Sequence, residues 1–156
     1  MDKQKLHGFF NLKCVRDGEV VWDTGWVPNI ITTAGVAQMA LLAGDATAVP
    51  FTYLAVGTST TAVDGAQTAL VDEITDSGLA RAAATVSRVT TTSTDDTLQL
   101  YKEWTVTGTK TVEEVGVFNA SSSGTMLARA LTTSKSVVNG DVVQGTYKVS
   151  FADDGV

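Results

Sequence analysis

The stretch LHGFFNLKCVRDGEVVW, residues 6–22, decides the fold of this chain. Apolar side chains in its first half fall on alternate positions, broken only by Gly8; they are Leu6, Phe10, Leu12 and Cys14. This period of two is typical of a strand with one buried face. Asp17-Gly18 then gives a hairpin signal, and a returning strand begins at Glu19. The stretch therefore predicts an antiparallel β-hairpin.

Short apolar runs separated by turn residues continue along the rest of the chain. One run covers residues 51–56 and ends at Gly57. Five more are predicted as strands, over residues 80–92, 98–107, 111–118, 125–131 and 142–151. Asn139-Gly140 is one of the breaks between them and favours a type I′ turn. This spacing predicts a mainly β fold, an antiparallel β-sandwich or jelly roll.

One segment, residues 34–43, has helical periodicity instead. Its apolar residues recur at helical spacing, namely Val36, Met39, Ala40 and Ala43. Thr32 or Thr33 can cap the helix at its start, and Gly44 suits a left-handed stop at its end. Pro28, which lacks a backbone N–H, is expected to end strand pairing before this segment. The sequence predicts one short α-helix near residues 34–43.

The length of 156 residues is that of one domain, and we expect a single β-rich domain over residues 1–156. Two elements are expected to extend from it, an N-terminal arm at about residues 1–6 and a long contact loop at residues 58–78. The loop carries one apolar island of Leu70, Val71 and Ile74. A loop of this length without secondary structure is uncommon in a compact domain, which favours a contact role. The alternative is that these side chains cover the domain's own core.

Composition argues against several classes of partner. The net charge is −6 and the 11 Lys and Arg are scattered, whereas nucleic-acid binding needs a basic stripe. No eighteen apolar residues run uninterrupted, so no membrane span is expected. The N-terminus does not lead into the apolar core of a signal peptide, which favours synthesis in the cytoplasm. We expect neither nucleic acid nor membrane as a partner.

Residues suited to catalysis or metal binding are scarce. His7 is the single histidine, and Ser59 lies in no nucleophile elbow. One His and one Cys are too few for a zinc site, and Cys14 is expected to be a small hydrophobe on a strand. Neighbours in a strand point to opposite faces, so Glu113 and Glu114 cannot face one site together, and this and the other acidic pairs are expected to be solvated. We expect a chain that is not an enzyme, with no catalytic residue, cofactor or metal.

The tryptophans are candidates for partner contact. Trp22 and Trp26 lie close together at a strand end, and Trp104 lies in a later strand. Tryptophan is more often part of a core than a ligand platform, but it is also enriched at interface hot spots. The candidate partner contacts are therefore Leu6, Trp22, Trp26, Leu70, Val71 and Ile74.

Five stretches between Asn29 and Phe151 carry a further pattern. They are NIITTAGVA (29–37), YLAVGT (53–58), RAAATVSRVT (81–90), VEEVGVFNA (112–120) and GTMLAR (124–129). Together they resemble a family of small structural proteins of tailed bacteriophages. The resemblance is to capsid decoration (cement) proteins, with tail- and fibre-associated proteins as near neighbours. The first thirty residues lie outside it.

This resemblance implies a virion protein that is synthesised in the host cytoplasm and located on the capsid surface. As a decoration protein, the chain would bind the major capsid protein and stabilise the head shell. Such proteins often sit over local three-fold positions, which implies a homotrimer. Binding would use strand pairing and apolar contact, because the net negative charge leaves no phosphate-like electrostatic mode. The alternative is a tail- or fibre-associated structural or receptor-binding protein.

Overall fold

Strand β1 (His7–Arg16) has the alternation that its sequence predicts. The computed structural model describes residues 6–151, and within β1 the even-numbered residues from Gly8 to Cys14 are buried. The odd-numbered residues between them are exposed or half-buried. One face of β1 therefore belongs to the core and the other to solvent.

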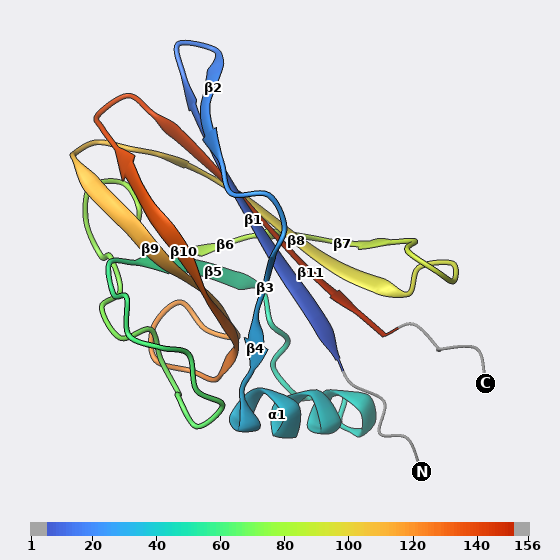
Figure 1. Ribbon diagram of the computed structural model, residues 1–156. Helices are drawn as coiled ribbons and strands as arrows, with labels where there is room; N and C mark the ends of the chain where they lie inside the picture. Colours follow the sequence, from blue (N-terminus) through green and yellow to red (C-terminus); the bar gives the residue numbers. More distant parts are fainter. Residues whose placement is uncertain (1–5, 152–156) are drawn as a thin grey trace.

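Two antiparallel sheets pack against each other (Figure 1). Sheet A has the order β2-β1-β11-β8-β7, with β3 also paired to β1, and sheet B has the order β4-β10-β9-β5-β6. The remaining strands are β2 (Glu19–Asp23), β3 (Val27–Pro28), β4 (Ile30–Ile31), β5 (Tyr53–Gly57), β6 (Ala82–Ala83), β7 (Thr85–Val89), β8 (Thr97–Thr105), β9 (Lys110–Phe118), β10 (Met126–Val137) and β11 (Val142–Ser150). The predicted antiparallel β-sandwich is confirmed.

The main core fills the space between the sheets. Sheet A contributes Phe10, Leu12, Leu100, Tyr147 and Val149, and sheet B contributes Leu54, Val56, Val115, Val117 and Leu127. Each of these side chains is at most 1% exposed. Burying one large apolar side chain stabilises a fold by roughly 1.5–3 kcal/mol, so this interior is the main source of stability.

The first hairpin forms as predicted, but the role assigned to Pro28 is wrong. Asp17 and Gly18 have φ values of 51° and 81°, the positive pair that a type I′ turn requires. Pro28 lies within β3 and pairs with Phe9 of β1. This pairing is possible because β3 is at the edge of sheet A, where a residue without an N–H is tolerated.

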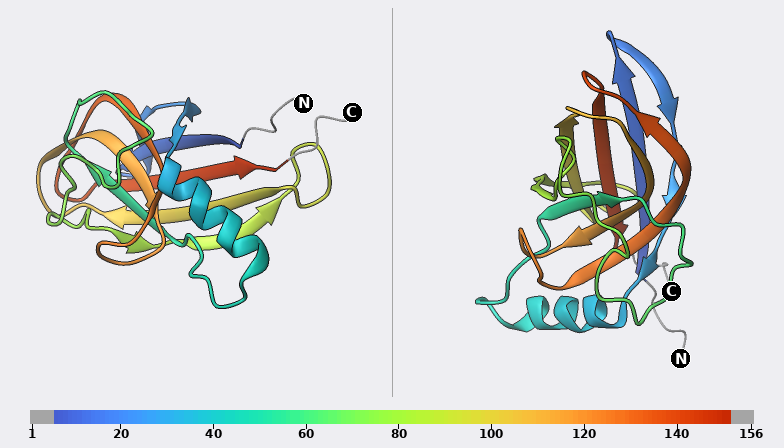
Figure 2. Two further views of the ribbon diagram at one scale, coloured as in Figure 1. Left: turned by 90° about the horizontal axis from the view of Figure 1, so that it is seen from below. Right: turned by 90° about the vertical axis from the view of Figure 1, so that its left-hand side faces the viewer.

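Helix α1 (Thr33–Gly44) lies across one end of the sandwich (Figures 1 and 2). The Thr32 hydroxyl caps it, accepting a hydrogen bond from the Gly35 N–H at 2.8 Å and donating one to the Met126 carbonyl at 2.5 Å. The predicted cap is therefore confirmed. The predicted left-handed stop at Gly44 is wrong, because Gly44 stays helical and the chain leaves the helix at Asp45 in extended conformation.

The two glycines at the ends of α1 should respond in opposite ways to alanine substitution. A Cβ at Gly35 would lie 2.7 Å from the backbone of Leu127, whereas a Cβ at Gly44 would meet nothing within 4 Å. We expect Gly35→Ala to lower the free energy of unfolding by about 1–3 kcal/mol through overpacking. Gly44→Ala should leave it unchanged or raise it by up to about 1 kcal/mol, because alanine favours the helix. Urea unfolding followed by circular dichroism measures both.

The buried carboxylate of Asp141 holds the turn between β10 and β11. It accepts hydrogen bonds from Arg16 at 2.7 Å and from the Val138 N–H at 2.8 Å. These bonds, that from Arg16 first, lower the pKa of Asp141 to about 2. The tip, Asn139-Gly140, is not the predicted type I′ turn, because only Gly140 has a positive φ. Cys14, nearby, is fully buried, and burial raises the pKa of its thiol to about 11.

Stability should fall in acid in a way that depends on Asp141. Its pKa is lower in the folded chain than the value of about 3.9 in an unfolded one, so its stabilising effect is complete above that value. The effect is lost as the pH falls from about 4 towards about 2. We expect Asp141→Asn to melt at a lower temperature than the parent at pH values above this window. The difference should shrink through it; a constant difference would contradict the assignment.

Candidate interaction surfaces

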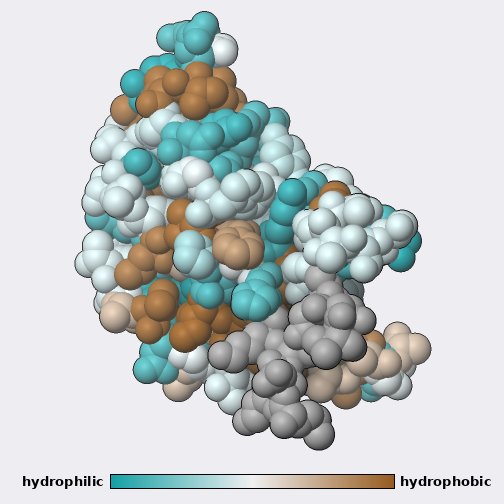
Figure 3. Space-filling model, turned by 45° about the vertical axis from the view of Figure 1, so that its right-hand side comes forward, coloured by the Kyte–Doolittle hydropathy of each residue, from teal (hydrophilic) through white to brown (hydrophobic). Residues whose placement is uncertain are grey.

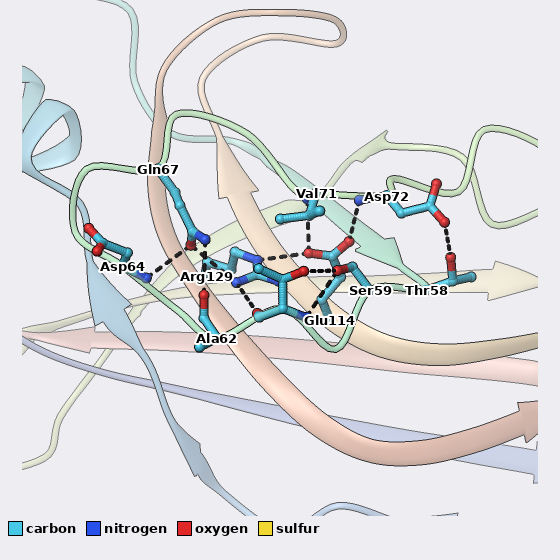
Figure 4. A network of polar contacts seen from close by, with 10 residues as sticks. Thr58, Ser59, Ala62, Asp64, Gln67, Val71, Asp72, Glu114 and Arg129 are labelled. Atoms are coloured by element: carbon cyan, nitrogen blue, oxygen red, sulfur yellow. Dashed lines mark hydrogen bonds and ion pairs between the residues drawn. The ribbon is translucent and has the colours of Figure 1, made fainter.

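The outer face of sheet B carries a buried ion pair. Glu114 of β9 and Arg129 of β10 are both fully buried, and Arg129 Nε donates to Glu114 Oε2 at 2.7 Å. The expectation that Glu114 is solvated is therefore wrong. The long segment between β5 and β6 passes over this face and excludes water from it (Figures 1 and 4).

This segment, residues 58–78, is bound through both members of the ion pair (Figure 4). Glu114 accepts the N–H groups of Val71 and Asp72, at 3.1 and 2.8 Å. Arg129 Nη1 donates to the Thr61 carbonyl at 2.9 Å and to Gln67 Oε1 at 3.1 Å. The charged pair thus replaces the backbone partners that a loop without strands or helices lacks.

Apolar packing also holds this segment against the outer face of sheet B. Leu70 is 7% exposed and packs with Ala55, Phe118 and Met126 in a second, smaller core on the outer face of sheet B. Its side chain occupies the space above Gly116, where a Cβ would lie 2.8 Å from Leu70 Cδ2. The loop is thus a third layer of the fold.

A second arginine fixes the end of this layer. Arg81 pairs with Glu73 at 2.6 Å, and its guanidinium lies 3.5 Å from the centre of the Phe118 ring. The same side chain donates to the carbonyls of Ala120 and Ser123 in the β9–β10 connection. Arg81 thereby ties the loop to a turn some forty residues away in sequence.

The loop residues proposed as partner contacts divide into two kinds. Ile74 is 4% exposed in the main core and Leu70 is buried as described, so these two side chains cover the chain's own core. This is the alternative that the sequence left open. Val71 lies between them and is 50% exposed. Only Val71 of the island is available to a partner.

The N-terminal candidates also differ in exposure. Residues 1–5 of the expected arm lie outside the described residues, while Leu6 is half-buried against the main core. Trp22 is half-buried as well, and its Nε1 donates to the Ser136 carbonyl at 2.9 Å. Trp104 is buried and donates to the Ala80 carbonyl. Trp26 alone among the tryptophans is exposed, at 51%.

Trp26 borders an open depression on the outer face of sheet A. Phe9, which is 40% exposed, and Lys148, whose Nζ lies 4.9 Å from the centre of the Trp26 ring, form part of its wall. The depression holds about 350 Å³. A further apolar patch lies below the hydrophilic tip of the β1–β2 hairpin, where Val20 and Val21 are exposed (Figure 3). Apolar contact, rather than charge, is what both surfaces offer.

Between residues 6 and 151, no group of three or more His, Cys, Asp or Glu side chains is placed to hold a metal ion. No helix in this same range is long and apolar enough to cross a membrane.

Residues 32–148 match the protein family described as podophage GP4 fiber I protein gp80. The chain belongs to this family. The match begins at the N-cap of α1 and ends in β11, so it includes the helix, the bound loop and β5 to β10. No curated protein and no solved structure matches the chain significantly. Membership of the gp80 family makes this chain a bacteriophage structural protein and fits the fibre-associated alternative better than capsid decoration.

Removing the buried guanidinium should be far more costly than removing an exposed one. Arg129→Met leaves the Glu114 carboxylate buried without its counter-ion, and we expect a loss of about 3–5 kcal/mol in the free energy of unfolding. Arg88→Met is the matched control, because Arg88 and Asp95 form an exposed pair at 4.0 Å; it should change stability by less than about 0.5 kcal/mol. Chemical denaturation compares them, and equal losses would contradict the role of the ion pair.

Proposed function

We propose that this chain is a non-enzymatic, fibre-associated structural component of a podophage virion. The observation that carries the proposal is the gp80 family match, which includes helix α1, β5 to β10 and most of β11. The structure is consistent with a structural subunit of a larger assembly. Its long loop is held in place by a buried ion pair, and its exposed apolar residues lie on open surfaces.

Within this role, the Trp26 surface and Val71 are the proposed contacts with neighbouring virion proteins. Trp26 presents a large, half-exposed ring beside Phe9, and large aromatic side chains contribute strongly to interfaces. Val71 lies at the outside of a loop whose backbone is fixed through Asp72 and Glu114. Contact there costs little conformational entropy, because the loop is already ordered.

Localisation on intact particles tests the fibre assignment. Gold-labelled antibody against this chain, viewed by electron microscopy on purified virions, should label the tail and its fibres. Labelling distributed over the head shell would overturn the proposal and favour a capsid decoration protein that contacts the major capsid protein. Particles lacking the gene for this chain provide the control for antibody specificity.

A further inference from the structure

The outward side of helix α1 is apolar along its whole length. Seven positions are exposed, and six of them recur at the spacing of a single helical face: Thr33, Val36, Ala37, Ala40, Leu41 and Gly44. The seventh, Ala43, lies at the edge of this face beside Val36. Val36 is 50% exposed and Leu41 is 47% exposed. A helix on a protein surface ordinarily places polar side chains on this side. We call these six residues the α1 stripe.

The opposite side of α1 is already used by the chain's own fold. Gly35 is buried against β10, and Met39 and Leu42 pack on the main core. Gln38 reaches back to the Val49 carbonyl at 3.0 Å. Rotating the helix to bury the stripe would expose these side chains instead, so apolar surface would remain in contact with water. A helix that is apolar on both sides is characteristic of a buried environment.

Charge leaves helix α1 as the part of the surface where a second copy of this chain can approach with little repulsion. The chain carries a net charge of −6, so two copies repel each other over most approaches. Helix α1 contains no charged residue at all. Two copies that meet through it bring no charges together and bury none.

The order of large and small residues also suits a copy of the same helix. At 3.6 residues per turn, Ala37 and Ala40 lie along the middle of the stripe, with Val36 on one flank and Leu41 on the other. Positions 36 and 41 are equally far from the midpoint, as are 37 and 40. In an antiparallel pair centred on this midpoint, Ala37 of one copy therefore lies opposite Ala40 of the other. Val36 of one copy lies at the same height as Leu41 of the other, on the opposite flank of the contact.

We propose that two copies of this chain associate through antiparallel packing of α1 against α1. This inference goes beyond the fibre assignment and does not depend on it. A helix of 12 residues is only about 18 Å long, so one such contact buries less than the roughly 800 Å² per partner of a standard interface. The pairing is therefore weak and depends on protein concentration. Two copies held close together in a virion would use it at high effective concentration.

Sedimentation equilibrium over a range of concentrations tests the pairing. The parent should rise from the mass of one chain towards that of two. Ala37→Glu and Leu41→Glu each place a charge in the stripe and should weaken association at least ten-fold. Val86→Glu is the control, because Val86 is 46% exposed on β7, away from the helix, and this variant should associate as the parent does. Circular dichroism establishes that all variants keep the fold.

Mixing two variants tests the antiparallel register. Because position 37 lies level with position 40 of the other copy, Ala37→Glu and Ala40→Lys should pair with each other more tightly than either pairs with itself. A parent that stays monomeric at every concentration would overturn the proposal, since a different partner would then be needed to cover the stripe. Equal association of the parent and the stripe variants would overturn it too. A mass of three chains, as the homotrimer expectation requires, would overturn the two-fold arrangement.

Discussion

The ion pair between Glu114 and Arg129 is the interaction on which the outer half of this fold depends. Taking two charges out of water costs several kcal/mol for each ion, and their attraction offsets this only when their other hydrogen-bonding groups are also satisfied. Here the loop supplies most of those groups, from the backbone of Thr61, Val71 and Asp72 and from the side chain of Gln67. Arg129 Nη2 is buried without a hydrogen-bond partner among the described residues. The ion pair and the loop therefore support each other. Without the loop the charges would be solvated, and without the charges the N–H groups of Val71 and Asp72 would lose their partner, although backbone bonds such as that from Ile74 to Val56 would remain.

Two glycines make room for this arrangement. A Cβ at Gly57 would lie 2.3 Å from Glu114 Oε1, and a Cβ at Gly116 would meet Leu70 Cδ2 at 2.8 Å. Both lie on the face of sheet B that the loop covers, where strands normally carry side chains. Because glycine has no side chain, the Glu114 carboxylate can approach the backbone at Gly57, and Leu70 can approach it at Gly116. The loop is consequently a fixed layer of the protein.

The sequence predicts the parts of this structure that follow from local periodicity. The β1–β2 hairpin, most of the later strands and the Thr32 cap each leave a signal within a few residues, and they are observed. The single strand predicted over residues 80–92 is wrong, because the chain there crosses from sheet B to sheet A and forms β6 and β7. The ion pair leaves no such signal, because Glu114 looks like a solvated strand residue until the loop is known to cover it. One clue exists in hindsight: opposite charges lie inside two successive apolar runs, two glutamates in VEEVGVF and one arginine in MLARAL. The prediction for Pro28 is wrong because an edge strand tolerates a residue without an N–H. The prediction for Gly44 is wrong because the helix ends at Asp45, whose N–H donates to the Leu41 carbonyl, and no left-handed glycine is needed.

The loop also determines which surfaces remain for function. By packing Leu70 over Gly116 and enclosing the ion pair of Glu114 and Arg129, the loop covers much of the outer face of sheet B. Large apolar side chains stay exposed at the end of the β1–β2 hairpin, around Trp26 and on helix α1, and also on the loop itself at Val63 and Val71. The main core between the sheets is filled without any of them. Their exposure therefore contributes nothing to the stability of the single chain, and these are the surfaces that we propose to contact neighbouring molecules.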